Sequence, residues 1–158
     1  LLVASSVSKI DYMLGLILSY FFFSLPGVAI YVALGIYFKI FTVYRSFVLF
    51  LLMLSLLFSE SSLAFIIAGL MKHIRNVWGI VSILSIILSV IPPIFYPYTF
   101  LPKPILYLLA FSPATPAAVI AQATFGLQPM NFYMPLALII ETVAYFALGL
   151  SFIRWKEK

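Results

Sequence analysis

Four stretches of the chain are apolar over at least 18 residues, and short polar or proline-rich segments separate them. They cover positions 12–37, 46–70, 77–94 and 133–153. An α-helix of about 20 apolar residues crosses the hydrocarbon core of a bilayer, which is about 30 Å thick. Because lipid offers no hydrogen-bond partners to the backbone, isolated apolar stretches of this kind span as helices. The pattern predicts an all-α, polytopic integral membrane protein with four transmembrane helices in a single domain, 1–158.

The ends and the middle of these stretches carry further signals. Asp11 precedes the first stretch and is placed to cap its helix. Within that stretch Pro26 and Gly27 predict a kink. The last stretch runs into Arg154, Trp155 and three further charged residues, which is typical of an interfacial anchor.

The segment 97–130 does not have the pattern of one helix. Seven prolines fall within 25 positions, 92–116: Pro92, Pro93, Pro97, Pro102, Pro104, Pro113 and Pro116. Pro102 can open a short helix that runs to Phe111. Thr115, which precedes a proline, then predicts the N-cap of a second short helix that ends near Gly126. We expect these two short helices to form an external re-entrant hairpin.

Composition supports a lipid environment. Hydrophobic residues make up 65% of the chain and charged residues 8%, and the mean hydropathy is +1.22. A water-soluble fold of this size could not cover its surface with polar groups. The net charge of +5 comes from basic residues outside the apolar stretches, so it reports topology and anionic lipid and argues against nucleic acid as a partner.

The distribution of Lys and Arg predicts an orientation. With four spans, six basic residues lie on the side of the N-terminus and three on the other. Since basic residues are enriched on the cytoplasmic side, both termini are expected in the cytoplasm, with 1–11 as a cytoplasmic lead-in. A five-span alternative, in which 104–125 also crosses, gives the same ratio with the N-terminus outside. Pro113 and Pro116 favour four spans, because they would break that extra helix at mid-membrane.

Two carboxyl groups fall inside the predicted spans, Glu60 and Glu141. An ionisable group at membrane depth is costly, so each is expected to face protein or a water-filled cavity. One interpretation is a substrate pathway built from Glu60, Ser59, Ser62 and Glu141. The alternative is a pair of buried, protonated carboxyls hydrogen-bonded to nearby hydroxyl groups. Ser55, Ser59 and Ser62 form a stripe at helical spacing that suits a helix-packing seam as well as a pore wall.

Motifs for enzymatic chemistry are missing from the sequence. It contains no P-loop with which to bind ATP, so any ATPase would be another polypeptide or domain. With no Cys, a single His and neither His-Glu-x-x-His nor Gly-x-Ser-x-Gly, it lacks the parts of a metalloenzyme or serine hydrolase. We expect neither catalysis, nor a cofactor, nor a metal site.

Four segments together carry a resemblance to a known family. Residues 4–15 read Ala-Ser-Ser-Val-Ser-Lys-Ile-Asp-Tyr-Met-Leu-Gly, and 66–75 read Ile-Ile-Ala-Gly-Leu-Met-Lys-His-Ile-Arg. Residues 94–102 read Ile-Phe-Tyr-Pro-Tyr-Thr-Phe-Leu-Pro, and 112–116 read Ser-Pro-Ala-Thr-Pro. This order is similar to that in the membrane domain of ABC type-2 exporters. There, a segment after the coupling helix, a basic cytoplasmic exit and an external proline series follow one another. The chain departs from the pattern at Leu16, where a Lys is common, at Ser112, where Asn is usual, and in the extra Pro116.

The resemblance spans nearly the whole sequence but only the last four of the six spans usual in such permeases, so it implies a fragment of a six-span protein. It implies a permease subunit in the cell membrane, acting as a dimer with a partner ATPase and moving an amphipathic or hydrophobic substrate outward. The residues that it assigns to coupling with the ATPase are Ser8, Lys9, Lys72 and Arg75. Those that it assigns to an external gate are Pro97, Pro102, Pro113 and Pro116.

Two other classes remain open on the sequence alone. A secondary transporter would need only an intramembrane carboxyl and a proton or ion gradient, and Glu60 or Glu141 could supply the carboxyl. A membrane subunit without transport activity would need neither. Dependence on ATP, as opposed to dependence on an ion gradient, separates the first two classes.

Overall fold

The computed structural model describes residues 8–70 and 74–152, without the side chains of 74–78 and 89. These residues form helices and no strand. In chain order the elements are α1 (Lys9–Tyr37), α2 (Val43–Leu70), α3 (Ile74–Val90), the 3-10 helix η2 (Tyr98–Phe100), α4 (Lys103–Leu109), α5 (Ala114–Thr124) and α6 (Tyr133–Phe152). The predicted all-α class is confirmed for the described residues, and the element boundaries differ by a few residues from those expected.

Helix α1 begins three residues earlier than the expected position 12. Its N-cap is Ser8, whose hydroxyl accepts a hydrogen bond from the backbone N–H of Asp11, while Asp11 accepts one from the backbone N–H of Ser8. Asp11 is therefore the third helical residue of a capping box and is not the cap itself. Pro26 lies inside α1 without ending it. At 29 residues the helix is about 43 Å long, which exceeds the thickness of the hydrocarbon core.

A short turn joins α1 to α2, as expected. Lys39 adopts a positive φ of 55° there. The ring of Phe41 packs directly onto Gly35, where any Cβ atom would overlap it. Thr42 then accepts a hydrogen bond from the backbone N–H of Arg45 and so caps α2, which begins three residues before the expected position 46. The turn is tight because Gly35 leaves room for the returning chain.

Helix α3 is shorter than the predicted span 77–94. It has 17 residues, about 25 Å, and ends at Val90 because Ile91 precedes Pro92, and a residue before proline is biased away from helical geometry. Among the described residues, α1, α2 and α6 are long and apolar enough to cross a membrane. A fourth span results only if α4 and α5 are taken together. Helix α3 is therefore shorter than the helix predicted over 77–94, and its crossing of the membrane stays a prediction.

The segment between α3 and α6 folds into two short helices, as expected, and α4 and α5 meet at an angle of 118°. We call them the bent pair. Helix α4 stops at Leu109, two residues before the expected end. Pro113 is the N-cap of α5, so Thr115 lies in the first turn and is not the cap that the sequence predicted. Helix α5 ends at Thr124, and Gly126 adopts a positive φ of 72° just beyond it.

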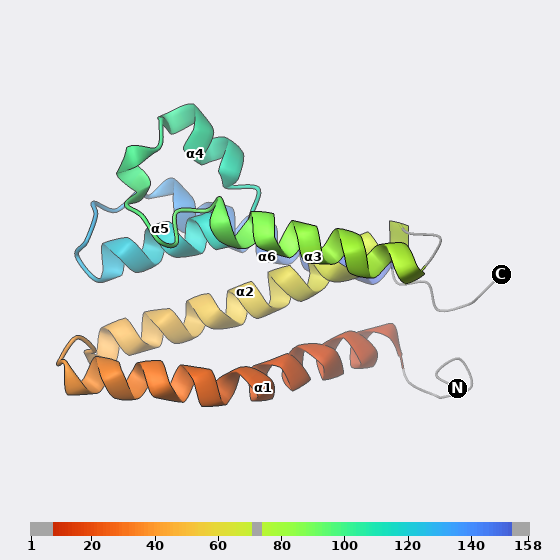
Figure 1. Ribbon diagram of the computed structural model, residues 1–158, viewed down its shortest axis with the longest axis horizontal. Helices are drawn as coiled ribbons and strands as arrows, with labels where there is room; N and C mark the ends of the chain where they lie inside the picture. The colour runs from red at the N-terminus through yellow and green to blue at the C-terminus, as the bar shows by residue number, and fades with distance from the viewer. Residues whose placement is uncertain (1–7, 71–73, 153–158) are drawn as a thin grey trace.

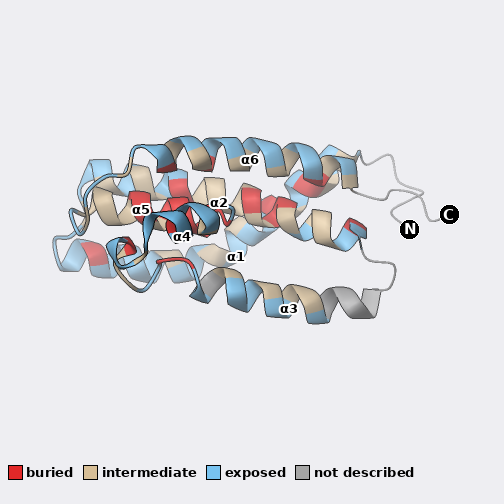
Figure 2. Ribbon diagram, turned by 90° about the horizontal axis from the view of Figure 1, so that it is seen from above, coloured by how far each residue is buried: buried red, intermediate tan, exposed pale blue. Residues whose placement is uncertain are grey.

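The long helices lie side by side (Figure 1). The starts of α1 and α3 and the ends of α2 and α6 gather at one end of the molecule, whereas the α1–α2 turn and the link from α5 to α6 lie at the other. Helix α2 is central and contacts α1, α3, α5 and α6. Figure 2 shows that buried residues concentrate where α2, α5 and α6 meet.

Large apolar side chains cover much of the outside. Phe23 on α1 is 83% exposed, Ile139 on α6 is 62% exposed, and many others resemble them. Water would make such a surface an aggregation hazard, whereas lipid tails or further apolar helices solvate it without cost. The described helices thus have the surface of a membrane-embedded protein.

Candidate functional site

A hydroxyl contact joins the middles of α2 and α6. The side-chain oxygens of Ser59 and Thr142 lie 3.0 Å apart. Ser59 Oγ is also 2.8 Å from the carbonyl oxygen of Ser55, and Thr142 Oγ1 is 2.7 Å from that of Leu138. Two hydroxyl hydrogens serve three contacts, so one hydroxyl donates across the interface while the other donates to its own helix.

Small residues bring the same two helices together further along. A Cβ atom on Gly149 would lie 3.2 Å from the carbonyl oxygen of Ser62, and one on Gly69 would overlap the backbone of Phe152. These contacts and the hydroxyl contact advance in the same order along both helices, which therefore run parallel. We call this interface the α2–α6 seam. Close packing of Gly and Ser with a polar contact is the usual basis of helix association in membranes.

Two serines that the sequence assigned to a candidate substrate pathway lie in the seam. Ser59 and Ser62 are fully buried in it, and Ser62 donates to the carbonyl of Phe58 on its own helix. Neither serine lines the cavity described next. This placement favours the packing interpretation of the serine stripe over the pore-wall interpretation.

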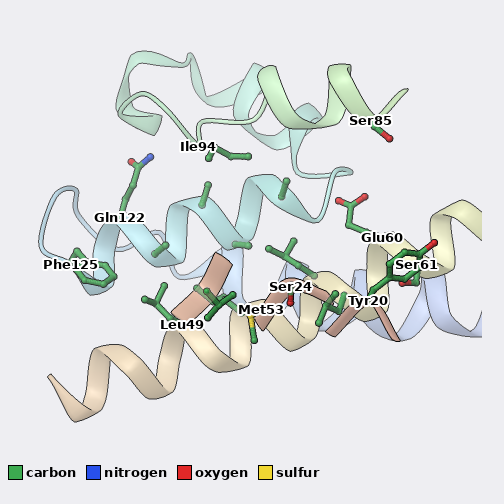
Figure 3. A pocket seen from close by; sticks show the side chains of 18 of the residues that line it. Tyr20, Ser24, Leu49, Met53, Glu60, Ser61, Ser85, Ile94, Gln122 and Phe125 are labelled. Atoms are coloured by element: carbon green, nitrogen blue, oxygen red, sulfur yellow. The ribbon is translucent and has the colours of Figure 1, made fainter. Parts of the chain in front are cut away.

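A cavity of about 840 Å³ lies between α1, α2, α3 and α5. We call it the central cavity, and Figure 3 shows the side chains around it. Most of its wall is apolar: α2 contributes residues such as Leu52, Met53 and Leu56, and α5 faces them. Polar lining groups include Glu60 and Ser61 of α2. Volumes of about 300–1,000 Å³ are usual for sites that hold drug-sized ligands.

Glu60 is the acidic residue of this cavity. Its carboxyl projects from α2 toward α3 (Figure 3) and is half-buried. No side chain among the described residues donates a hydrogen bond to it, and none of the described Lys or Arg side chains contributes to the cavity lining. The hydrogen bonds expected from the neighbouring serines are not formed, because Ser59 and Ser62 are engaged within the seam.

Glu141 lies outside the cavity lining, on the same side of the seam as Glu60. Glu60 follows Ser59, and Glu141 precedes Thr142. For two parallel helices in contact through Ser59 and Thr142, these steps of +100° and −100° turn both carboxyls toward the same side. Tyr145 follows Glu141 by one turn and therefore shares its face of α6. The two acids that the sequence singled out separately thus lie on one side of the seam, Glu60 in the cavity lining and Glu141 outside it.

The break in the bent pair lies against this side of α6. Tyr145 donates a hydrogen bond of 2.6 Å to the carbonyl oxygen of Phe111, between α4 and α5. Pro113 and Pro116 are fully buried. The hydroxyls of Ser112 and Thr115, and one oxygen of Glu141, are buried without a hydrogen-bond partner among the described residues. Buried polar atoms of this kind are uncommon, and they concentrate at this break.

The four predicted gate prolines lie in different parts of the segment between α3 and α6. Pro113 and Pro116 lie at the buried break, whereas Pro97 is the N-cap of η2 and Pro102 the N-cap of α4, both outside the core. Helix α5 packs on α2 and α6, whereas α4 lies on the outer side of α5 (Figure 1) and reaches the core through Leu106. The ring of Tyr107 also meets that of Tyr133 at the start of α6, with ring centroids 6.3 Å apart. The bent pair therefore has an inner arm, α5, and an outer arm, α4.

Gln122 is a functional candidate that the sequence prediction missed. Its amide nitrogen donates to the carbonyl oxygens of Pro93 and Tyr96, at 2.6 and 2.9 Å, and its oxygen accepts from the backbone N–H of Tyr98 at 3.0 Å. Gln122 also lines the central cavity. It ties the link after α3 to the inner arm. A lone amide in an alanine-rich apolar helix was the available signal.

The residues assigned to coupling with an ATPase are only partly described. Ser8 and Lys9 lie at the start of α1, and Arg75 lies in the first turn of α3, at the same end of the molecule (Figure 1). Lys72 falls outside the described residues. The structure brings the starts of α1 and α3 to one end and describes no contact between these coupling candidates.

No family model, curated protein or solved structure matches this chain. The geometry of the described residues and the pattern of the sequence are therefore the basis for assigning a function. Three features carry that argument: the bent pair, the central cavity with its single acidic residue, and the gathering of helix ends.

Proposed function

We propose that the chain is the permease part of an ABC exporter, comprising the last four spans of a six-span membrane domain. It acts as a dimer in the cell membrane, and a partner ATPase supplies the energy to move an amphipathic or hydrophobic substrate outward. In this proposal α1, α2, α3 and α6 cross the bilayer, both termini are cytoplasmic, and the bent pair enters from outside without crossing.

The bent pair is the observation that carries the proposal. A broken backbone is tolerated at membrane depth only where protein buries it. On the α5 side of the break Pro113 and Pro116 are fully buried, and Tyr145 donates a hydrogen bond to the carbonyl of Phe111, so protein covers this part of the backbone. An arm of this kind above a cavity between spans suits a gate that opens as substrate leaves.

The ends of the helices agree with the proposed orientation. The start of α1 and the start of α3 share one end of the molecule with the ends of α2 and α6. Lys9 and Arg75 lie at that end, and Lys39 and Arg45 at the α1–α2 turn. In the sequence, the basic segments 72–75 and 154–158 directly flank α3 and α6, so the positive-inside bias supports a cytoplasmic location for this end.

Cross-linking to an ATPase tests the proposal. A photoreactive side chain at Lys9 should cross-link to an ATP-hydrolysing subunit in the native membrane, and substrate export should stop when that subunit's ATPase is inactivated. A matched probe at Val43, at the opposite end of α2, should give no such product. Export that persists without ATP hydrolysis would refute the proposal.

A second candidate function, proton-coupled transport, is favoured by one specific observation. Glu60 and Glu141 lie on the same side of the seam, and Glu60 lines the central cavity. Intramembrane carboxyls are typical of proton relays. In that case an uncoupler should abolish transport while depletion of ATP should not.

A further inference from the structure

The central cavity has an apolar body and an acidic end. Helix α5 faces it with four alanines, Ala114, Ala117, Ala118 and Ala121, which recur on one face of the helix. Opposite them stand the larger apolar side chains of α2, Leu52, Met53 and Leu56 among them. Because the alanines are small, the gap between α2 and α5 stays open over about two turns of α5. This part of the cavity suits a bulky hydrocarbon group.

The acidic end lies one turn further along α2. Glu60 and Ser61 follow the apolar lining residues of that helix, and Tyr20 of α1 lies beside them in Figure 3. Among the described residues, Glu60 is the single charged side chain of the lining. Its carboxyl has no hydrogen-bond donor among them, although an unpaired carboxylate in apolar surroundings is costly. The cavity therefore lacks the counter-charge that would make Glu60 favourable there.

We propose that the central cavity binds a lipophilic monovalent cation. Its charge would lie at Glu60, and its apolar body would lie along the alanine face of α5. As a statement about the transported substrate this rests on the proposed export function, but the binding itself does not depend on ATP. A zwitterionic lipid fits less well, because no described residue of the lining carries a positive charge to pair with its phosphate.

Binding of tetraphenylphosphonium to the full chain in lipid nanodiscs tests the proposal. This cation has an apolar body and one permanent charge, and tetraphenylborate has the same shape with the opposite charge. Equilibrium dialysis should show saturable binding of the phosphonium and no saturable binding of the borate. The affinity should be the same in nanodiscs made with or without phosphatidylethanolamine, which excludes the lipid amine as the natural occupant.

Substitutions test separately the charge of Glu60 and the space beside α5. Glu60→Gln should weaken phosphonium binding at least about tenfold, because it removes the Coulomb attraction of the carboxylate for a cation that donates no hydrogen bond. Glu60→Asp should restore most of the binding. Ala118→Phe, which fills the space beside α5, should weaken binding while leaving Glu60 in place. Asp11→Asn, the same chemical change far from the cavity, should have no effect. Thermal unfolding of each variant confirms that it is folded.

The outcomes distinguish this proposal from the export function. Equal affinity of the wild type and Glu60→Gln, or equal binding of the borate, would overturn the proposed cation site. ATP-driven export of neutral lipophiles without phosphonium binding would overturn it too, and would leave the exporter intact. Phosphonium binding that depends on Glu60, in a protein whose transport ignores ATP, would support the site and refute the exporter.

Discussion

At the scale of single residues, the α2–α6 seam shows how small side chains set the distance between helices. Gly149 faces the backbone of Ser62, whereas Gly15 on α1 has open space around it. Both glycines lie in helices, so a substitution changes helix propensity equally at the two sites. The space available to the new side chain is what differs. At Gly149 a side chain must push two helices apart, and at Gly15 it enters open space.

We predict that Gly149→Leu lowers the free energy of unfolding by about 1–3 kcal/mol, the usual cost of forcing extra atoms into a packed interface. Gly15→Leu should leave it unchanged or raise it by up to about 1 kcal/mol, since leucine is the better helix former. Reversible unfolding in mixed micelles measures both values. Equal effects of the two substitutions would show that the seam is not a close contact.

The sequence predicted the serine stripe and both intramembrane acids but could not assign their directions. Ser59 faces α6 and Glu60 faces the central cavity, although the two are neighbours in the chain. Which face of α2 meets which helix depends on the fold of the whole bundle. Periodicity within one helix carries no information about that. For the same reason, the pairing of Ser59 with Thr142 could not be read from either helix alone.

At the scale of elements, the prolines set most of the differences between expected and observed boundaries. The sequence correctly predicted the turn after α1, the two short helices and the start of α6 at Tyr133. It placed the end of α3 too late because a continuous apolar run conceals the effect of Pro92 on the residue before it. It placed the start of α5 too late because Thr115 is a good N-cap by residue type, yet Pro113 already occupies that position.

The double substitution of Pro113 and Pro116 by Ala should let α4 and α5 join into a longer apolar helix. The alanines restore two backbone N–H donors and remove the rings that interrupt the helix. We expect transport to fall while membrane insertion is retained. Protease protection of 104–125 would reveal whether the joined helix has become an additional span. Transport at the wild-type rate would show that the break plays no part in gating.

Gln122 holds the link after α3 through three hydrogen bonds. Gln122→Leu should leave the carbonyls of Pro93 and Tyr96 without donors, at a cost of about 1–3 kcal/mol for each buried group. Hydrogen exchange should then rise in 94–101 while α2 stays protected. Gln128→Leu is the matched control, since Gln128 accepts one hydrogen bond from the exposed Thr99. Unchanged exchange in the Gln122 variant would contradict this anchoring role.

At the scale of the whole molecule, charge and hydropathy predicted the class of protein but not its interior. The central cavity forms where α5 lies opposite α2. The apolar stretch of α2 contains no signal that would predict this arrangement. The number of spans is the other open quantity, because α3 has 17 residues and the bent pair changes direction by 118°. A helix of 17 residues is near the shortest that reaches across a bilayer, and the bent pair reaches across only if its two arms count as one span.

Labelling of single cysteines tests the proposed topology. A membrane-impermeant maleimide applied to intact cells should react with cysteine at Val43 and at Tyr107, and should not react at Lys9 until the membrane is opened. Val43 and Tyr107 are exposed in the structure, so access to them is not limited by packing. Labelling at Lys9 from outside would invert the orientation. Protection at Tyr107 would place α4 within the bilayer.

The hydroxyl groups of the seam that bond to carbonyls of their own helix have a consequence for insertion of the chain into the membrane. Ser59 and Thr142 each reach a carbonyl of their own helix, as does Ser62. More than 70 residues lie between α2 and the middle of α6, so a ribosome releases α2 to the bilayer well before its partner exists. During that interval Ser59 and Ser62 keep a carbonyl partner within α2, so lipid leaves neither hydroxyl unsatisfied. These two hydroxyls therefore need no partner from α6 while α2 is alone in the bilayer.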